Sequence, residues 1–78
     1  MKKVQIKLST IEDVRNFVNT VSQSNVDTDL ISGRYTVDAK SLMGIFSLDL
    51  LNAIDLVIHS DDEAKVNKVL DGIKQFIV

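Results

Sequence analysis

The feature of this sequence that most constrains its fold is the change in spacing of apolar residues along the chain. Strand-like alternation of apolar and polar residues covers residues 3–8, 26–32, 34–39 and 53–59. Spacing typical of amphipathic helices covers residues 11–21, 41–50 and 66–77. The order is therefore strand, helix, strand, strand, helix, strand, helix. This order predicts a two-layer α+β sandwich, with helices covering one face of a sheet.

The ends of the expected elements carry turn and capping residues. Two capping boxes are expected at helix starts, Ser9 with Glu12 or Thr10 with Asp13, and Ser60 with Glu63. Ser32–Gly33 is expected to form a tight hairpin turn between the two middle strands. Gly72 lies inside the last helix, which it weakens by about 1 kcal/mol relative to alanine.

Length and composition restrict the class of protein. The chain has 78 residues, 45% of them hydrophobic, which predicts a single domain over residues 1–78 with one modest core. Its 9 basic and 11 acidic residues are interspersed and give a net charge of −2, which argues against a nucleic-acid-binding protein. The absence of cysteine excludes disulfides and thiolate metal sites. No apolar run resembles a signal peptide or a membrane span, so a cytoplasmic domain is expected.

The short central helix carries more apolar residues than one buried face requires. At about 100° per residue, one arc of this helix holds Ile45, Leu48 and Leu51. A second arc holds Leu42, Met43, Phe46 and Leu50. Because a chain this short can hardly cover both arcs, we interpret the first arc as core and Leu42, Met43 and Phe46 as a candidate docking patch. The patch is expected to bind a protein partner or a second copy of the chain, and burial within the monomer is the alternative.

The same segment carries a resemblance to a known family. Lys40–Leu48 reads K-S-L-M-G-I-F-S-L. It resembles the regulatory segment of HPr, the histidine-containing phosphocarrier of the bacterial sugar phosphotransferase system. The order of strands and helices agrees with that family along nearly the whole chain. Apolar spacing alone leaves a ferredoxin-like plait as a rival, whereas the resemblance implies an antiparallel four-stranded sheet in the order 1-4-2-3 with the helices on one face.

The phosphoacceptor motif of that family is replaced in this chain. Proteins similar to HPr carry a G-L-H-x-R-P-A segment at the start of the first helix. With the alignment anchored on Phe17–Val18, the histidine position falls on Thr10, the arginine position on Glu12 and the proline position on Asp13. A helix start that bears two acidic residues is expected to repel phosphate. The resemblance therefore predicts a non-catalytic HPr-like protein without metal or cofactor, which binds or regulates a protein partner through its second helix.

Two residues keep other functions open. Ser41 matches the serine that a regulatory kinase phosphorylates in some members of the family, and it is also a favoured helix N-cap. His59 is the chain's single histidine and lies at the end of the fourth strand. The alternatives are therefore a phosphocarrier with an unusual acceptor, Ser41 or His59, and a kinase-regulated signalling module.

Acidic clusters in the sequence are more simply explained by structure than by chemistry. His59 with Asp61, Asp62 and Glu63 gives only a weak indication of metal binding, because dedicated sites converge three or four ligands. The three carboxylates suit the first turn of a helix. The residues Asp27, Asp29 and Asp38 are expected on a solvated face of the sheet. Paired acids do acid–base work in a cleft, and nothing in the sequence indicates one there.

Overall fold

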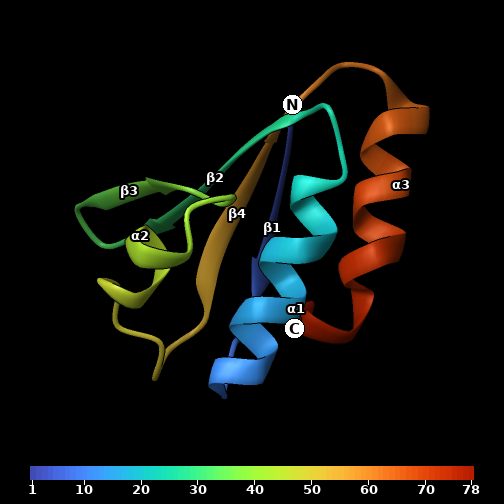
Figure 1. Ribbon diagram of the computed structural model, residues 1–78. Coiled ribbons are helices and arrows are strands. Elements are labelled where there is room, and N and C mark those ends of the chain that lie inside the picture. Colours follow the sequence, from blue (N-terminus) through green and yellow to red (C-terminus); the bar gives the residue numbers. More distant parts are fainter.

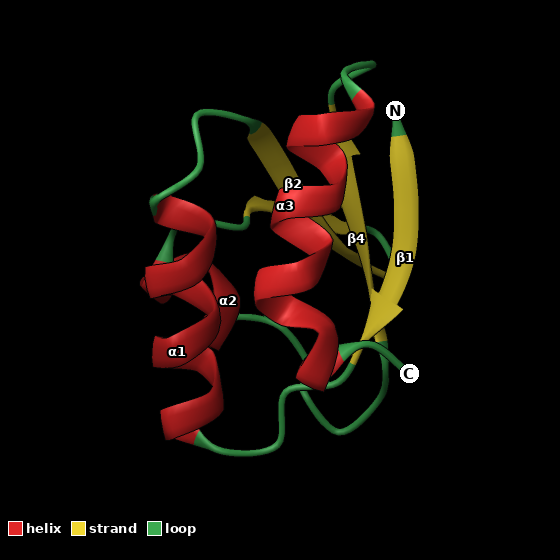
Figure 2. Cartoon of the chain, turned by 90° about the vertical axis from the view of Figure 1, so that its right-hand side faces the viewer, coloured by secondary structure: helices red, strands yellow, loops and turns green.

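The computed structural model describes all residues 1–78 and contains four strands and three helices (Figure 1). The elements are β1 (Lys2–Ile6), α1 (Ile11–Ser22), β2 (Asp27–Ser32), β3 (Tyr35–Asp38), α2 (Leu42–Phe46), β4 (Ile54–His59) and α3 (Glu63–Ile73), followed by a 3₁₀ turn (Lys74–Phe76). The strands form one sheet in the order β1-β4-β2-β3, and every neighbouring pair is antiparallel. All three helices lie on one face of the sheet (Figure 2). The predicted α+β sandwich and its 1-4-2-3 order are confirmed, and the ferredoxin-like alternative is removed.

The central position of β4 follows from its apolar residues on both faces. Ile54, Leu56 and Ile58 point toward the helices and are at most 2% exposed. Val57 points to the other face and is still only 8% exposed. β4 pairs with β1 on one side and with β2 on the other. At the centre of the sheet, side chains of both neighbouring strands crowd around each face of β4. A strand that is apolar on both faces therefore loses most contact with water in this position.

One cluster of 17 buried apolar side chains joins the sheet to the helices. α1 contributes Val14, Phe17 and Val21, and α3 contributes Val66, Val69 and Ile73. The expected stripe of α1 is too wide at its start, since Ile11 is 66% exposed. The expected stripe of α3 is too long, because the helix ends at Ile73 and the 3₁₀ turn sends Phe76 into the core. Ile77 forms an isolated β-bridge with Ile6 instead.

The hairpin between β2 and β3 turns one residue later than expected. Ser32 still pairs with Tyr35, so the two turn residues are Gly33 and Arg34. Gly33 has a φ of +60°, and no non-glycine residue has a positive φ. A positive φ at the first turn position alone defines a type II′ turn, which suits the twist of two antiparallel strands and favours glycine there.

The helix caps also differ in detail from the expected capping boxes. α1 uses the Thr10–Asp13 alternative, because Thr10 Oγ1 accepts a hydrogen bond from the Asp13 N–H at 3.0 Å. The Asp13 carboxylate reaches back to the N–H of Ser9 at 3.1 Å. At α3 the expected Ser60 cap is wrong, since the N-cap is Asp62, which accepts from two N–H groups of the first turn. A carboxylate there also suits the positive end of the helix dipole.

Thr28 is a buried polar residue without a partner, and its replacement by valine is expected to stabilise the protein. Thr28 lies on β2 and is 2% exposed, and its Oγ1 has no hydrogen-bond partner. An unpaired buried hydroxyl costs roughly 1–3 kcal/mol, and valine has nearly the same shape. We expect Thr28→Val to raise the free energy of unfolding by about 1 kcal/mol in urea denaturation.

The matched control for this change is Thr36→Val on the exposed edge strand β3. We expect this control to change the free energy of unfolding by less than about 0.5 kcal/mol. A loss of stability in Thr28→Val would mean that the Thr28 hydroxyl has a partner, for example a buried water.

Candidate functional site

The second helix is a short element seated directly on strand β3. Ser41 is its N-cap, and Ser41 Oγ accepts a hydrogen bond from the Gly44 N–H at 3.1 Å. Ile45 points into the core and is fully buried. A Cβ added at Gly44 would lie 3.2 Å from Val37 Cβ and 3.1 Å from Ser41 Oγ. Glycine at this position therefore lets the helix approach β3 closely.

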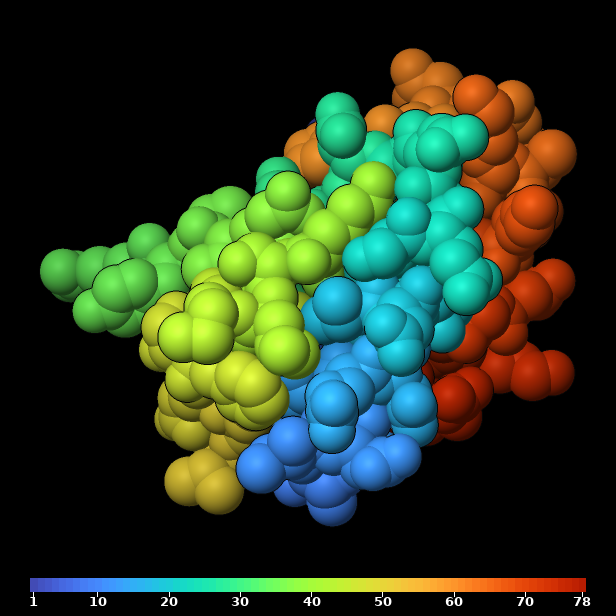
Figure 3. Space-filling view, viewed as in Figure 1, coloured from blue at the N-terminus to red at the C-terminus, as the bar shows by residue number.

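Three apolar side chains of α2 point away from the core. Met43 is 79% exposed, Phe46 42% and Leu42 36%. We call Leu42, Met43 and Phe46 the α2 patch. Figure 3 shows the surface of residues 40–50 in yellow-green, next to the blue and cyan surface of α1. The patch is open to solvent, as a docking surface has to be, and partner binding remains a prediction.

The arc of this helix that we interpreted as core, Ile45, Leu48 and Leu51, is only partly buried. Ile45 and Leu48 are buried, but Leu51 is 84% exposed. The reason is that α2 ends at Phe46 rather than continuing to Leu50. Beyond its end the chain leaves the helical path, and Leu50 packs partly against the core while Leu51 faces solvent.

Both flanks of α2 are tied to distant parts of the chain. Before the helix, the Lys40 ammonium donates to the Ser24 carbonyl oxygen at 3.3 Å. After the helix, the Lys7 ammonium donates to the carbonyl oxygens of Leu50, at 3.1 Å, and Leu51. These hydrogen bonds fix the ends of a helix that is too short to be stable by itself. The α2 patch is therefore presented on an anchored element.

The N-cap role of Ser41 gives a stability prediction for the same helix. Ser41→Ala removes the acceptor for the Gly44 N–H, and we expect a loss of about 1 kcal/mol in the free energy of unfolding. Ser41→Asp keeps an acceptor and is expected to lose less. Urea denaturation measures both changes, and faster amide exchange at Gly44 in Ser41→Ala localises the effect to α2. Ser9→Ala is the control, because that residue is exposed and only its backbone N–H is bonded.

The start of α1 is occupied by its own side chains. Thr10, at the position that the resemblance assigns to the phosphoacceptor histidine, is the N-cap. Glu12 and Asp13 lie in the first turn, and the Asp13 carboxylate is bonded to the preceding backbone. The positive end of this helix dipole is thus already complemented by acidic groups.

His59 lies at the other end of the molecule from the start of α1. α1 begins at the bottom of Figure 1, and β4 ends at the top. His59 Nε2 is 2.8 Å from Asp29 Oδ2, across the β2–β4 pair. The predicted acids Asp27, Asp29 and Asp38 lie on β2 and β3, and no group of three or more metal-ligating side chains is assembled.

Two of the carboxylates that follow His59, Asp61 and Asp62, bind the N-terminus and the start of α3. The N-terminal ammonium donates a hydrogen bond to Asp61 at 2.8 Å. That hydrogen bond, and then the positive charge itself, lowers the pKa of Asp61 below its ordinary value. Asp62 caps α3. These groups therefore have structural partners, and they do not converge with His59 on a ligand.

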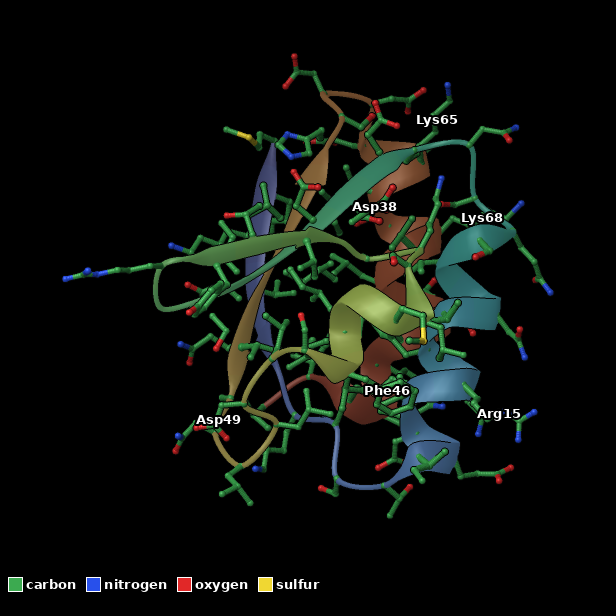
Figure 4. All side chains as sticks on the ribbon, turned by 60° about the vertical axis from the view of Figure 1, so that its left-hand side comes forward. Arg15, Asp38, Phe46, Asp49, Lys65 and Lys68 are labelled. Atoms are coloured by element: carbon green, nitrogen blue, oxygen red, sulfur yellow. The ribbon has the colours of Figure 1, made fainter.

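A groove of about 530 Å³ runs between the end of α1 and α3, and sequence reasoning did not find it. Lys65 and Lys68, labelled in Figure 4, line it together with Gln23 and Asn25. The i, i+3 spacing of the two lysines on one helix was the available signal. The groove also adjoins the residues that follow α1, so its two lysines bring positive charge to the side of the molecule where that helix ends.

Comparison with known proteins supports the fold. Among solved structures, the chain is similar to one described as HPr-C-His from Thermoanaerobacter tengcongensis, with 29% sequence identity and a TM-score of 0.76. The match covers 96% of this chain and 93% of that one. No family model matches the sequence, and no curated protein matches it. No helix has the length and apolar character needed to cross a membrane.

The sheet order and this likeness together define the class of the protein. The chain has an HPr-like α+β fold, the fold of the carrier of the sugar phosphotransferase system. Within that fold, the α2 patch is the exposed apolar surface that the sequence pointed to.

Proposed function

We propose that the chain is a non-catalytic HPr-like protein that binds or regulates a protein partner through the α2 patch in the cytoplasm. The observation that carries this proposal is the exposure of Met43 and Phe46 on an anchored helix. Methionine and aromatic residues are enriched at protein interfaces, and methionine adapts to different partners.

The residues at the start of α1 support the absence of phosphohistidine transfer. A transferable phosphate would need a histidine at the N-cap, free N–H groups and a nearby cation. This chain has Thr10 at the N-cap, with Glu12 and Asp13 in the first turn. A phosphoryl group held there would meet two negative charges rather than a positive one.

Phosphoryl transfer can be tested directly. Incubation of the full chain with the general phosphotransferase Enzyme I and phosphoenolpyruvate is expected to leave it unlabelled. Acid-labile label on His59 would instead establish an atypical carrier. In a parallel reaction with ATP and an HPr kinase, label that disappears in Ser41→Ala would favour the kinase-regulated alternative.

Partner binding through the α2 patch is tested by capture from an extract of the host cells. The immobilised chain is expected to retain a specific protein, and Met43→Asp is expected to lose it. Met43 is the most exposed residue of the patch, so the change leaves the core intact. Val78→Asp is the matched control, since Val78 is also apolar and 71% exposed but lies outside α2. Equal retention by both variants would contradict the proposal.

A further inference from the structure

Opposite charges flank the α2 patch. Figure 4 shows Arg15 of α1 on one side of Phe46 and Asp49, which follows α2, on the other. Both side chains are exposed. Neither takes part in an ion pair within the chain, where the pairs are Met1–Asp61, Lys3–Asp55 and His59–Asp29.

The surroundings of each charge explain why it stays available. Arg15 makes no side-chain hydrogen bond, and the Asp49 carboxylate accepts only from the Leu51 N–H, at 3.0 Å, and from Asn52, at 3.4 Å. A partner surface with only positive or only negative charge would attract one of these two residues and repel the other. A partner surface with a negative charge opposite Arg15 and a positive charge opposite Asp49 would attract both.

We infer that the α2 patch binds a second copy of the chain, an inference that rests on the proposed function and specifies its partner. A two-fold axis near Phe46 relates the two copies, so that the Arg15 side of one patch lies against the Asp49 side of the other. Arg15 of one protomer then faces Asp49 of its partner, and the same pair forms again on the other side. The apolar side chains of both copies are buried between the two ion pairs, and the interface is self-complementary in charge.

The size of the patch sets the strength of this association. The exposed parts of Leu42, Met43 and Phe46 amount to roughly 300 Å², comparable to the largest apolar patch on a typical monomer. A standard interface buries about 800 Å² per partner, so this contact belongs to the weak class. We expect a concentration-dependent dimer with a dissociation constant on the order of 0.1–1 mM.

Sedimentation equilibrium of the full chain measures this association. Between about 20 μM and about 2 mM, the average mass is expected to rise from one chain toward two. Arg15→Asp and Asp49→Arg each place like charges across the axis, and each is expected to weaken association by at least about tenfold. Arg34→Asp, in the exposed hairpin turn, is the charge-matched control and is expected to leave association unchanged.

A mixture of the two charge-reversed variants provides the decisive measurement. In a heterodimer of Arg15→Asp with Asp49→Arg, one protomer has a carboxylate at both positions and its partner has an arginine at both. Each carboxylate therefore faces an arginine across the axis. The equimolar mixture is therefore expected to associate about as well as the unmodified chain, although neither variant does so alone. Local damage from losing the Asp49 hydrogen bonds would not be repaired by mixing, so rescue separates docking from folding.

Three results would overturn the inference. They are a single-chain mass at every concentration, association that neither charge reversal weakens, and failure of the mixture to associate. If the chain is monomeric while Met43→Asp still loses a different protein from the extract, self-association is wrong and the proposed function stands. If that capture fails as well, both are wrong.

Discussion

Replacing Phe17 with alanine is expected to lower the free energy of unfolding by about 3–5 kcal/mol, the largest effect of any single change considered for this chain. Phe17 is fully buried at the middle of α1 and is the largest fully buried side chain in the molecule. A domain of this size has a stability of only about 4–12 kcal/mol, so the variant will be close to unfolding. The midpoint of urea denaturation, followed by circular dichroism, measures the loss.

The control for Phe17→Ala lies on the same helix. Ile11 is also apolar but is 66% exposed, so Ile11→Ala is expected to change stability by at most about 0.5 kcal/mol. Phe17 also meets Phe76 edge to face, with ring centroids 6.0 Å apart and planes at 77°. A double-mutant cycle with Phe76→Leu is expected to give a coupling of about 0.5–1.5 kcal/mol. Equal losses in Phe17→Ala and Ile11→Ala would contradict this description of the core.

The sheet was predictable because local sequence and burial agree along every strand. Ile54, Leu56 and Ile58 alternate along β4 and all face the core. The structure pairs Ile54 with Ile6 of β1, and it places Leu56 between Val4 of β1 and Leu30 of β2. Val57 is apolar on the opposite face of β4, as suits a central strand, and β4 lies between β1 and β2. The strand order itself came from the resemblance, since alternation identifies the faces of a strand but not its neighbours.

The errors occur where long-range contacts decide the local structure. Apolar spacing extended α2 to Leu50, but the helix ends at Phe46, and the carbonyl groups of Leu50 and Leu51 accept hydrogen bonds from Lys7, which follows β1. The cap of α3 moved from Ser60 to Asp62, although both residues are good caps. Phe76 enters the core only because a 3₁₀ turn follows α3. The region after α2 and the burial of Phe76 thus involve residues far away in the sequence, Lys7 and Phe17.

The α2 patch could be predicted from the sequence, but the charges that flank it could not. Leu42, Met43 and Phe46 exceed what one buried face of a short helix needs, which is a local property. Arg15 and Asp49 belong to different elements, and only the packing of α1 beside α2 brings them to opposite sides of Phe46 (Figure 4). The apolar patch is thus a local feature, whereas the placing of opposite charges on its two sides is a property of the fold.

Replacing Gly72 with alanine is expected to destabilise the protein by about 1–2 kcal/mol, although alanine is the better helix former by about 1 kcal/mol. A Cβ at position 72 would lie 2.6 Å from Thr20 Cγ2, so α3 and α1 would have to separate. Thr20 cannot easily turn its methyl group away, because its Oγ1 donates to the Asn16 carbonyl oxygen at 3.0 Å. Urea denaturation of the variant measures the balance between overpacking and helix propensity.

The sign of this effect is expected to reverse when the Thr20 methyl group is removed. Thr20→Ser keeps the hydroxyl that bonds to Asn16 and deletes Cγ2, so alanine at position 72 should then fit and add up to about 1 kcal/mol of stability. The coupling between the two positions is therefore expected to be about 2–3 kcal/mol. Asn67→Ala, at an exposed position of α3, shows the effect of propensity alone. A gain from Gly72→Ala with Thr20 still present would mean that the two helices separate at little cost, and that close packing does not require glycine there.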